Sequence, residues 1–223
     1  MDMKTAINFR HSVRQFTGEP LKQDVVDALN GRIVEINRET GLNIKLVQNE
    51  PKTFKSFMAH VGGFKNADNY LVMAAPKGAE FLELVGYYGE ELVLMAQTMG
   101  VNSCWVGGTY KLKDKDKYLE GKDTVPVVIA LGYGVTQGNL HRSKPFETLS
   151  ATPQEGAPDW YVEGVRAAMA APTAMNQQKF QLKLKDGNKV ALKAKGKDMV
   201  LVDKGIVKFN FEIGAGVQNF IWA

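Results

Sequence analysis

The order of apolar and polar residues predicts a chain in which helices and strands alternate from end to end. Apolar residues recur at helical spacing over residues 20–38, with Pro20 in the first turn, and again over residues 79–99. Gly41 and Gly100 are the expected ends of these two helices. Nearly every turn of the second helix is apolar, so we expect it to be enclosed on most sides at the centre of the core.

Short apolar segments between turn residues predict strands at residues 43–48, 69–75, 103–106, 125–132, 179–185, 189–195 and 199–202. The first two should pair with each other, and Asp186-Gly187-Asn188 is a good hairpin turn between the fifth and the sixth. Another helix is expected at residues 159–170, before Pro172. The chain therefore mixes helix and sheet throughout, which predicts the α+β class.

The second half of the chain repeats the first in outline. Helix 20–38, two strands and helix 81–99 correspond in order to helix 159–170, strands 180–184 and 199–202, and an apolar segment at residues 206–222. The correspondence lies in order and hydrophobic pattern, with little identity, so an internal duplication is a hypothesis. We predict two pseudo-symmetric halves, residues 1–144 and a shorter half, residues 145–223.

Composition indicates an ordinary folded protein. The chain has 223 residues, 44% of them hydrophobic and 23% charged, which is enough for one good core. Neither a signal peptide nor an apolar run of membrane-spanning length is apparent, so we expect a cytoplasmic protein without a membrane partner. Cys104 is the single cysteine and fits a buried strand position, so redox chemistry would need a cofactor.

The net charge of +4 permits an anionic ligand, but the lysines are spread along the chain. One basic cluster falls on the predicted hairpin, where alternation places many of its members on the solvent face: Lys183, Lys185, Lys189, Lys193, Lys195 and Lys197. Neither a recognition helix nor an aromatic platform accompanies this cluster, so no nucleic-acid partner is predicted. The three histidines are scattered, and no metal site is predicted.

The stretch Arg10-His11-Ser12-Val13-Arg14 carries the strongest chemical signal. Arg10, Ser12 and Arg14 can meet a single phosphate whether the chain is extended or helical, because alternate residues share a face in a strand and residues four apart do so in a helix. Guanidinium forks and a hydroxyl suit a phosphate monoester, which points to a mononucleotide cofactor. Solvated basic residues near a terminus are the plain alternative.

A second signal follows the helix at residues 159–170. Pro172-Thr173-Ala174-Met175-Asn176-Gln177-Gln178, together with the arginine motif, resembles the flavin-dependent nitroreductases, which carry Arg-x-Ser-x-Arg/Lys and Pro-Ser-x-x-Asn-x-Gln-Pro-Trp. Thr173 stands for the usual Ser, and Lys179 and Phe180 stand for Pro and Trp. Helix capping by Thr173 and Asn176 is the alternative.

The resemblance implies a nitroreductase-like fold, with an antiparallel-rich mixed sheet around a central buried helix. It also implies that FMN is held by Arg10, His11, Ser12 and Arg14, by the turn of Val106, Gly107 and Gly108, by Arg142 and Lys144, and by Pro172, Thr173, Asn176 and Gln178. Paired glycines let backbone amides approach a planar ligand, although a tight turn would explain them equally well.

The order of the motifs departs from that of ordinary nitroreductases, where the Pro-Ser-x-x-Asn element follows soon after the arginine motif. Here it begins at Pro172. In the usual homodimer the two motifs come from different chains and meet at a flavin on the subunit interface. We therefore expect this chain to fuse both halves, to form one complete flavin site, and to act as a monomeric pseudo-dimer or as a homodimer.

By the same resemblance, no side chain needs to be a nucleophile, because flavin N5 accepts a hydride from NADH or NADPH and passes it to a nitroaromatic, a quinone or a similar small acceptor. Two other classes of function stay open: a flavin-binding protein without turnover, and a basic interaction protein without flavin. A third alternative is a dinucleotide-binding loop at residues 132–138, although its glycine spacing is wrong by one residue and no helix is expected after it.

Overall fold

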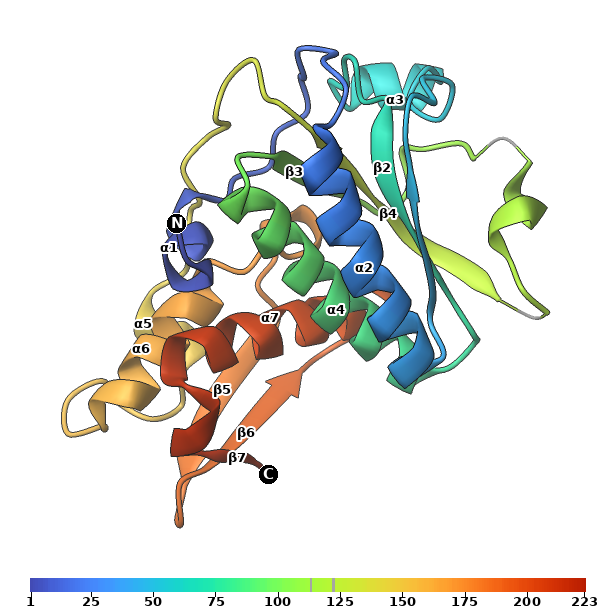
Figure 1. Ribbon diagram of the computed structural model, residues 1–223. Coiled ribbons are helices and arrows are strands. Elements are labelled where there is room, and N and C mark those ends of the chain that lie inside the picture. Colours follow the sequence, from blue (N-terminus) through green and yellow to red (C-terminus); the bar gives the residue numbers. More distant parts are fainter. Residues whose placement is uncertain (113, 122) are drawn as a thin grey trace.

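The computed structural model describes residues 1–112, 114–121 and 123–223, without the side chain of Met58. Its architecture is α+β, as expected (Figure 1). The helices are α1 (Met3–Phe9), α2 (Gln23–Thr40), α3 (Phe57–Val61), α4 (Ala79–Thr98), α5 (Phe146–Leu149), α6 (Asp159–Met169) and α7 (Met199–Ala215), with short 3-10 turns at Lys115–Tyr118, Ala174–Asn176 and Val217–Asn219. The strands are β1 (Asn43–Val47), β2 (Asn69–Ala75), β3 (Asn102–Val106), β4 (Thr124–Gly132), β5 (Phe180–Lys185), β6 (Lys189–Ala194) and β7 (Ile221–Trp222).

The larger sheet has the strand order β1–β2–β4–β3 and is antiparallel throughout. All seven residues of β2 are buried, because both faces of the sheet are covered. Leu71 and Met73 pack in the core that contains α2 and α4, whereas Tyr70 and Val72 pack in a second core with the N-terminal segment. The predicted pairing of the first two strands is confirmed, and Cys104 is buried in β3 as expected.

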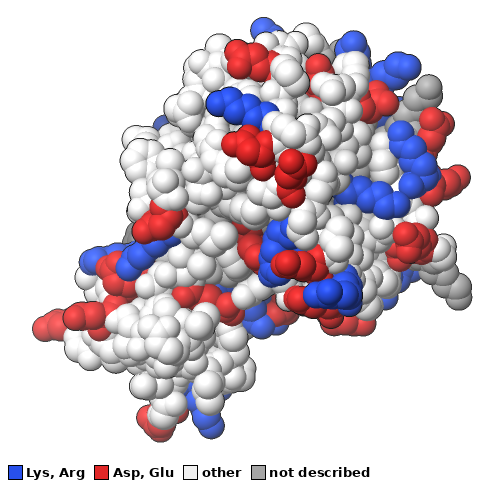
Figure 2. All heavy atoms as spheres, viewed as in Figure 1, with Lys and Arg blue, Asp and Glu red and all other residues white. Residues whose placement is uncertain are grey.

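The smaller sheet has the order β5–β6–β7, with an antiparallel hairpin and one parallel pair between β6 and β7. It lies with α6 and α7 at the lower end of the molecule in Figure 1. The lysines of this hairpin are exposed, as the alternation predicted. On the face shown in Figure 2, blue and red side chains lie near one another, as on an ordinary solvated surface.

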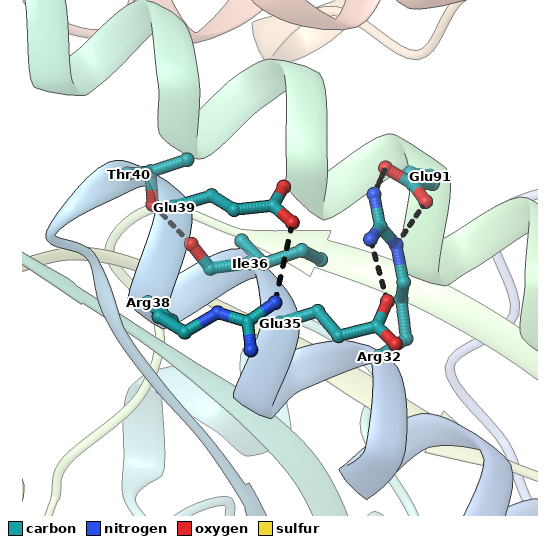
Figure 3. Close-up of polar contacts among 7 residues, drawn as sticks. All are labelled: Arg32, Glu35, Ile36, Arg38, Glu39, Thr40 and Glu91. Atoms are coloured by element: carbon teal, nitrogen blue, oxygen red, sulfur yellow. Dashed lines mark hydrogen bonds and ion pairs between the residues drawn. The ribbon is translucent and has the colours of Figure 1, made fainter.

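Helix α2 covers one face of the larger sheet beside α4 (Figure 1). It begins at Gln23 instead of residue 20, so Pro20 lies in the preceding loop, and it ends at Gly41, whose φ is 73°. Arg32 joins the two helices (Figure 3): its Nε donates to Glu91 Oε1 at 2.6 Å and its Nη1 donates to Glu35 Oε2 at 2.8 Å. Such partly exposed pairs contribute modestly, so the apolar contact holds the helices together.

The core is built around two helices, α4 and α7, and the predicted strand at residues 199–202 is wrong. These residues form the first turn of α7, which buries apolar side chains on most of its surface. The two helices meet at glycines: a Cβ on Gly86 would lie 1.9 Å from Val202 O, and a Cβ on Gly205 would lie 2.0 Å from Glu83 O. Only glycine permits this close approach.

The glycine contact is reciprocal. Gly86 contacts Val202, three positions before Gly205, and Gly205 contacts Glu83, three positions before Gly86. A two-fold-like relation between α4 and α7 produces this pattern. Apart from the short helix α3 between β1 and β2, the order helix, strand, strand, helix also repeats, as α2–β1–β2–α4 and α6–β5–β6–α7, with β6 in the place predicted for residues 199–202. The fold thus has two pseudo-symmetric halves.

Candidate functional site

A cavity of about 1440 Å³ lies where the N-terminal segment, the turn after β3 and the chain after α6 meet. All but two of the residues predicted to bind a cofactor line it: Arg10, His11, Ser12, Arg14, Val106, Gly107, Gly108, Arg142, Pro172, Thr173 and Asn176. One face of α7 completes the lining with Met199, Val202, Asp203 and Ile206. The opening arginines and the late proline–asparagine corner therefore share one cavity, although more than 150 residues separate them in sequence.

The arginine motif is extended, not helical. Val13 N donates to Ser103 O at 2.9 Å, and Ser12 forms a parallel bridge with Ser103 at the edge of β3. Of the three motif residues, Arg10 is only 3% exposed, whereas Ser12 and Arg14 are exposed. All three line the cavity, as the alternation of an extended chain predicts.

The end of β4 and the glycine-rich loop after it pack against this segment. A Cβ on Gly132 would lie 2.8 Å from Phe16, one on Gly134 would lie 2.9 Å from Val13, and one on Gly138 would lie 2.9 Å from His11. The His11 ring nitrogen Nδ1 is also 3.0 Å from Gln137 O. These glycines make room for the protein's own N-terminal segment, so the dinucleotide-loop alternative is not supported.

The corner at residues 172–178 is tied to the loop that carries Arg142. Asn176 Nδ2 donates to Arg142 O at 2.9 Å, and Gln178 N donates to Thr173 Oγ1 at 3.0 Å. Met175, Asn176 and Gln178 have φ values of 53°, 54° and 46°, in the left-handed region. Backbone strain of this kind persists only where surrounding contacts impose it, and it is typical of binding sites.

Two predicted residues, Lys144 and Gln178, lie outside the cavity lining. Lys144 Nζ donates to Gln177 O at 2.6 Å and to Gln178 O at 3.3 Å. Gln178 is buried, donates through Nε2 to Arg142 O and accepts through Oε1 from Lys144 N. Both residues therefore hold the two cavity loops together in this structure. Lys179 and Phe180, which depart from the usual Pro and Trp, also lie outside the lining.

Arg10 faces a buried carboxylate on the central helix. Its Nε is 3.7 Å from Glu90 Oε1, and Glu90 Oε2 accepts from Trp105 Nε1 at 3.1 Å. Glu90 is fully buried, and this burial raises the pKa of its carboxyl to about 7, against the opposing effects of Arg10 and Trp105. Glu90 thus orients both an arginine and an aromatic ring that line the cavity.

Replacing Glu90 by glutamine should change how stability depends on pH. The carboxyl titrates near 4.5 when unfolded and near 7 when folded. Between these values the folded state binds the extra proton, so the contribution of Glu90 to stability declines as pH rises from about 4.5 to about 7 and is constant above that. In urea unfolding of the flavin-free proteins, the free energy of unfolding of the parent should therefore decline over this pH range relative to that of Glu90→Gln.

The exposed Glu155→Gln is the control, and its stability should follow the parent at every pH. Other carboxyls titrate equally in all three proteins, so the difference between parent and Glu90→Gln isolates this residue. If the free energies of unfolding of the parent and of Glu90→Gln changed with pH in parallel, the assignment of Glu90 as a buried acid with a raised pKa would be refuted.

The cavity lining fits an anionic, planar ligand. Arg10 Nε and Nη1 are buried and have no hydrogen-bond partner within the part of the chain that the structure describes. Buried donors of this kind are costly unless a ligand satisfies them. Three arginines line the cavity against one carboxylate, Asp203, and the Trp105 ring adds an apolar surface. FMN offers both features that this lining suits, an anionic phosphate and a flat ring system.

Sequence reasoning did not identify Glu90, Trp105, Met199 or Asp203. A signal existed for Glu90, a carboxylate in a helix predicted to be enclosed on most sides. No comparable signal marks Asp203, because the sequence predicts a strand at residues 199–202 and an apolar segment of undefined structure after it.

Comparison with known proteins places these observations in a family. The sequence model of a family described as "Putative TM nitroreductase" matches residues 2–215. The chain belongs to this family. Membership supports a general oxidoreductase function with small-molecule substrates. No protein of curated function matches the chain.

Solved structures share the fold. A crystal structure described as a putative nitroreductase from Thermotoga maritima is 23% identical, with a TM-score of 0.71 over 96% of this chain and 83% of that one. Nitroreductase A from Vibrio parahaemolyticus is 16% identical, with a TM-score of 0.53 over 71% of this chain and 78% of that one. A protein of Parabacteroides distasonis, described as a putative NADH dehydrogenase/NAD(P)H nitroreductase, is 17% identical, with a TM-score of 0.52 over 70% of this chain and 98% of that one.

The prediction of an α+β, nitroreductase-like fold is confirmed by these similarities and by the structure. No helix in the described part of the chain is both long and apolar enough to span a bilayer.

Proposed function

We propose that this chain is an FMN-dependent NAD(P)H oxidoreductase that reduces nitroaromatic compounds, quinones or similar small acceptors by a ping-pong mechanism. One observation carries the proposal: the arginine motif and the proline–asparagine corner line the same cavity, and a buried guanidinium in it has donors without a hydrogen-bond partner among the described residues. Family membership supports the reaction class.

The residues of the cavity would hold FMN in distinct ways. Arg10, Arg14 and Arg142 supply positive charge for its phosphate or for the negative edge of the reduced ring, and Ser12 offers a hydroxyl. The backbone of Val106, Gly107 and Gly108 reaches the cavity where the chain leaves β3. Lys144 and Gln178 would act by fixing the loop that carries Arg142. When bound, FMN supplies hydride transfer, so no protein nucleophile is required.

The size of the cavity suits two ligands. Sites for one small molecule measure roughly 300–1000 Å³, whereas this cavity measures about 1440 Å³. Apolar side chains of Leu140 and Met175 are exposed at its rim, by 83% and 90%. Such a rim favours aromatic acceptors, which would enter the space beside the cofactor after the nicotinamide has left.

The test is a two-stage titration of the purified chain. Flavin-free protein should bind FMN with a shift in the visible flavin spectrum, and anaerobic NADH or NADPH should then bleach that spectrum. Subsequent addition of menadione or a nitroaromatic compound should restore it. Because the stages are separate, the experiment distinguishes the three classes of function that the sequence leaves open.

Each alternative has its own outcome. A flavin-binding protein without turnover would show the spectral shift and no bleaching. A basic interaction protein would bind no flavin, and it would bind nucleic acid with an affinity that falls with salt. Either result would refute the proposed reaction.

A further inference from the structure

Asp203 is a buried carboxylate in the wall of the cavity. It is 7% exposed, and its Oδ1 accepts a hydrogen bond from Ala174 N at 2.9 Å. Its other oxygen, Oδ2, has no hydrogen-bond partner among the described residues and is not one of their buried unpaired atoms, so it keeps contact with solvent in a residue that lines the cavity. The Ala174 contact therefore fixes the carboxyl group while it leaves one oxygen available to a ligand.

Asp203 lies close to the turn of Val106, Gly107 and Gly108, which the family resemblance places beside the flavin ring, where hydride transfer would occur. Met199 and Asp203 are four residues apart and lie on the same face of α7. Met199 packs on the glycine turn, since a Cβ on Gly107 would lie 3.3 Å from Met199 Cε. Asp203 is thus one helical turn, about 6 Å along the axis, from the residue that touches this turn.

Among the described residues that line the cavity, Asp203 is the one carboxylate, and the rest of the charged lining is basic. From the N-terminal segment the cavity receives Arg10, His11 and Arg14, and from the next loop His141 and Arg142. The positive charge of Lys179, which follows the corner, also acts to lower the pKa of Asp203. A carboxylate repels the phosphate of the cofactor, so Asp203 is poorly suited to that part of the site. The reaction itself offers this carboxyl another role, because an acceptor that gains a hydride also needs a proton.

We infer that Asp203 is a catalytic residue that donates a proton from Oδ2 to the small acceptor as it is reduced. This inference rests on the proposed function. With a quinone as acceptor, hydride uptake gives the hydroquinone monoanion, and its two electrons come ultimately from NAD(P)H, which is oxidised. The Asp203 Oδ2–H bond then breaks and the hydroquinone O–H bond forms. The carboxylate recovers a proton from water.

The acidity of Asp203 agrees with this role. Burial raises the pKa of the carboxyl to about 6, while the Ala174 amide and Lys179 act in the opposite direction. A general acid works best when its pKa lies near the working pH. Burial and the Arg10 charge also lower the pKa of His141, which makes this imidazole a weaker proton carrier at neutral pH.

The test compares the FMN-loaded parent with Asp203→Asn and with a control, Asp198→Asn. Asparagine keeps a carbonyl oxygen for Ala174 N but cannot donate a carboxyl proton. Asp198 lies just before α7, is exposed and lies outside the cavity lining. Each protein is reduced anaerobically with NADPH and then mixed in a stopped-flow instrument with menadione, or with ferricyanide, which accepts electrons without a proton.

NADPH should bleach the flavin spectrum of all three proteins at similar rates. Asp203→Asn should then reduce menadione about 100-fold more slowly and ferricyanide at the rate of the parent. The menadione rate of the parent should fall above pH 6, and that of the variant should not. An independent readout is the ¹³C carboxyl resonance of Asp203 in the flavin-free protein, which should titrate near pH 6.

An unchanged menadione rate in Asp203→Asn would overturn the inference. So would an equal loss with ferricyanide or in bleaching, because either would indicate a structural role, and so would titration of the carboxyl near its ordinary value of 3.8. If the parent itself neither binds FMN nor bleaches, the proposed function fails and this inference fails with it.

Discussion

Replacing Arg10 by alanine is expected to weaken FMN binding by about 100-fold or more. Arg10 is 3% exposed, and two of its donor nitrogens have no hydrogen-bond partner among the described residues. A charged contact in such a desolvated position is commonly worth about 2–5 kcal/mol, and each 1.4 kcal/mol is tenfold in affinity. Titration of the variant with FMN, followed by the quenching of flavin fluorescence, measures the effect.

Arg10→Lys should recover only part of the affinity, because lysine keeps the charge but lacks the planar fork. Arg38→Ala is the matched control, since Arg38 lies on the outer surface of α2 and its side chain is 74% exposed. The double variant Arg10→Ala/Glu90→Gln removes the buried carboxylate that the single change leaves without its arginine, and it should bind FMN equally weakly. FMN affinity at the parent level in folded Arg10→Ala would refute the assignment of this site.

Replacing Gly86 by alanine is expected to destabilise the protein by more than about 3 kcal/mol, although alanine is the better helix former. The new Cβ would lie 1.9 Å from the backbone oxygen of Val202, so α4 and α7 would have to move apart. These two helices form the centre of the core, and a backbone atom cannot rotate away as a side chain does. Urea unfolding at constant pH measures the loss.

Two further variants make this prediction specific. Gly205→Ala should cause a similar loss, because its Cβ would lie 2.0 Å from Glu83 O in the reciprocal contact. Gly31→Ala in α2 is the control: no atom lies within 4 Å of the added methyl group, so it should stabilise the protein by about 0.5–1 kcal/mol. If Gly86→Ala behaved like Gly31→Ala, the close helix contact would be refuted.

The division into halves at residues 144 and 145, the monomeric or dimeric state, and the cytoplasmic location stay predictions from the sequence. The extensive packing of α4 on α7 does bear on whether the two halves fold independently. Since each half supplies one of the two central helices, we expect them to fold together, and a single cooperative unfolding transition would agree with this.

The sequence by itself determined most of the elements and the family resemblance. Helices α2, α4 and α6 and six of the seven strands were predictable within a few residues, because their apolar residues repeat with a clear period or lie between turn residues. The arginine motif and the proline–asparagine corner were recognisable because each keeps a fixed local spacing. Local patterns of this kind survive when the rest of a sequence diverges.

Only the tertiary structure decided the rest. The sequence predicts a strand at residues 199–202, because a short apolar run has no period that distinguishes a strand from a helix buried on most sides. The same ambiguity hid Asp203, whose place in the cavity depends on α7. The pairing of Glu90 with Arg10 depends on the packing of α4 beside the N-terminal segment, a contact between residues 80 positions apart, which no local pattern encodes.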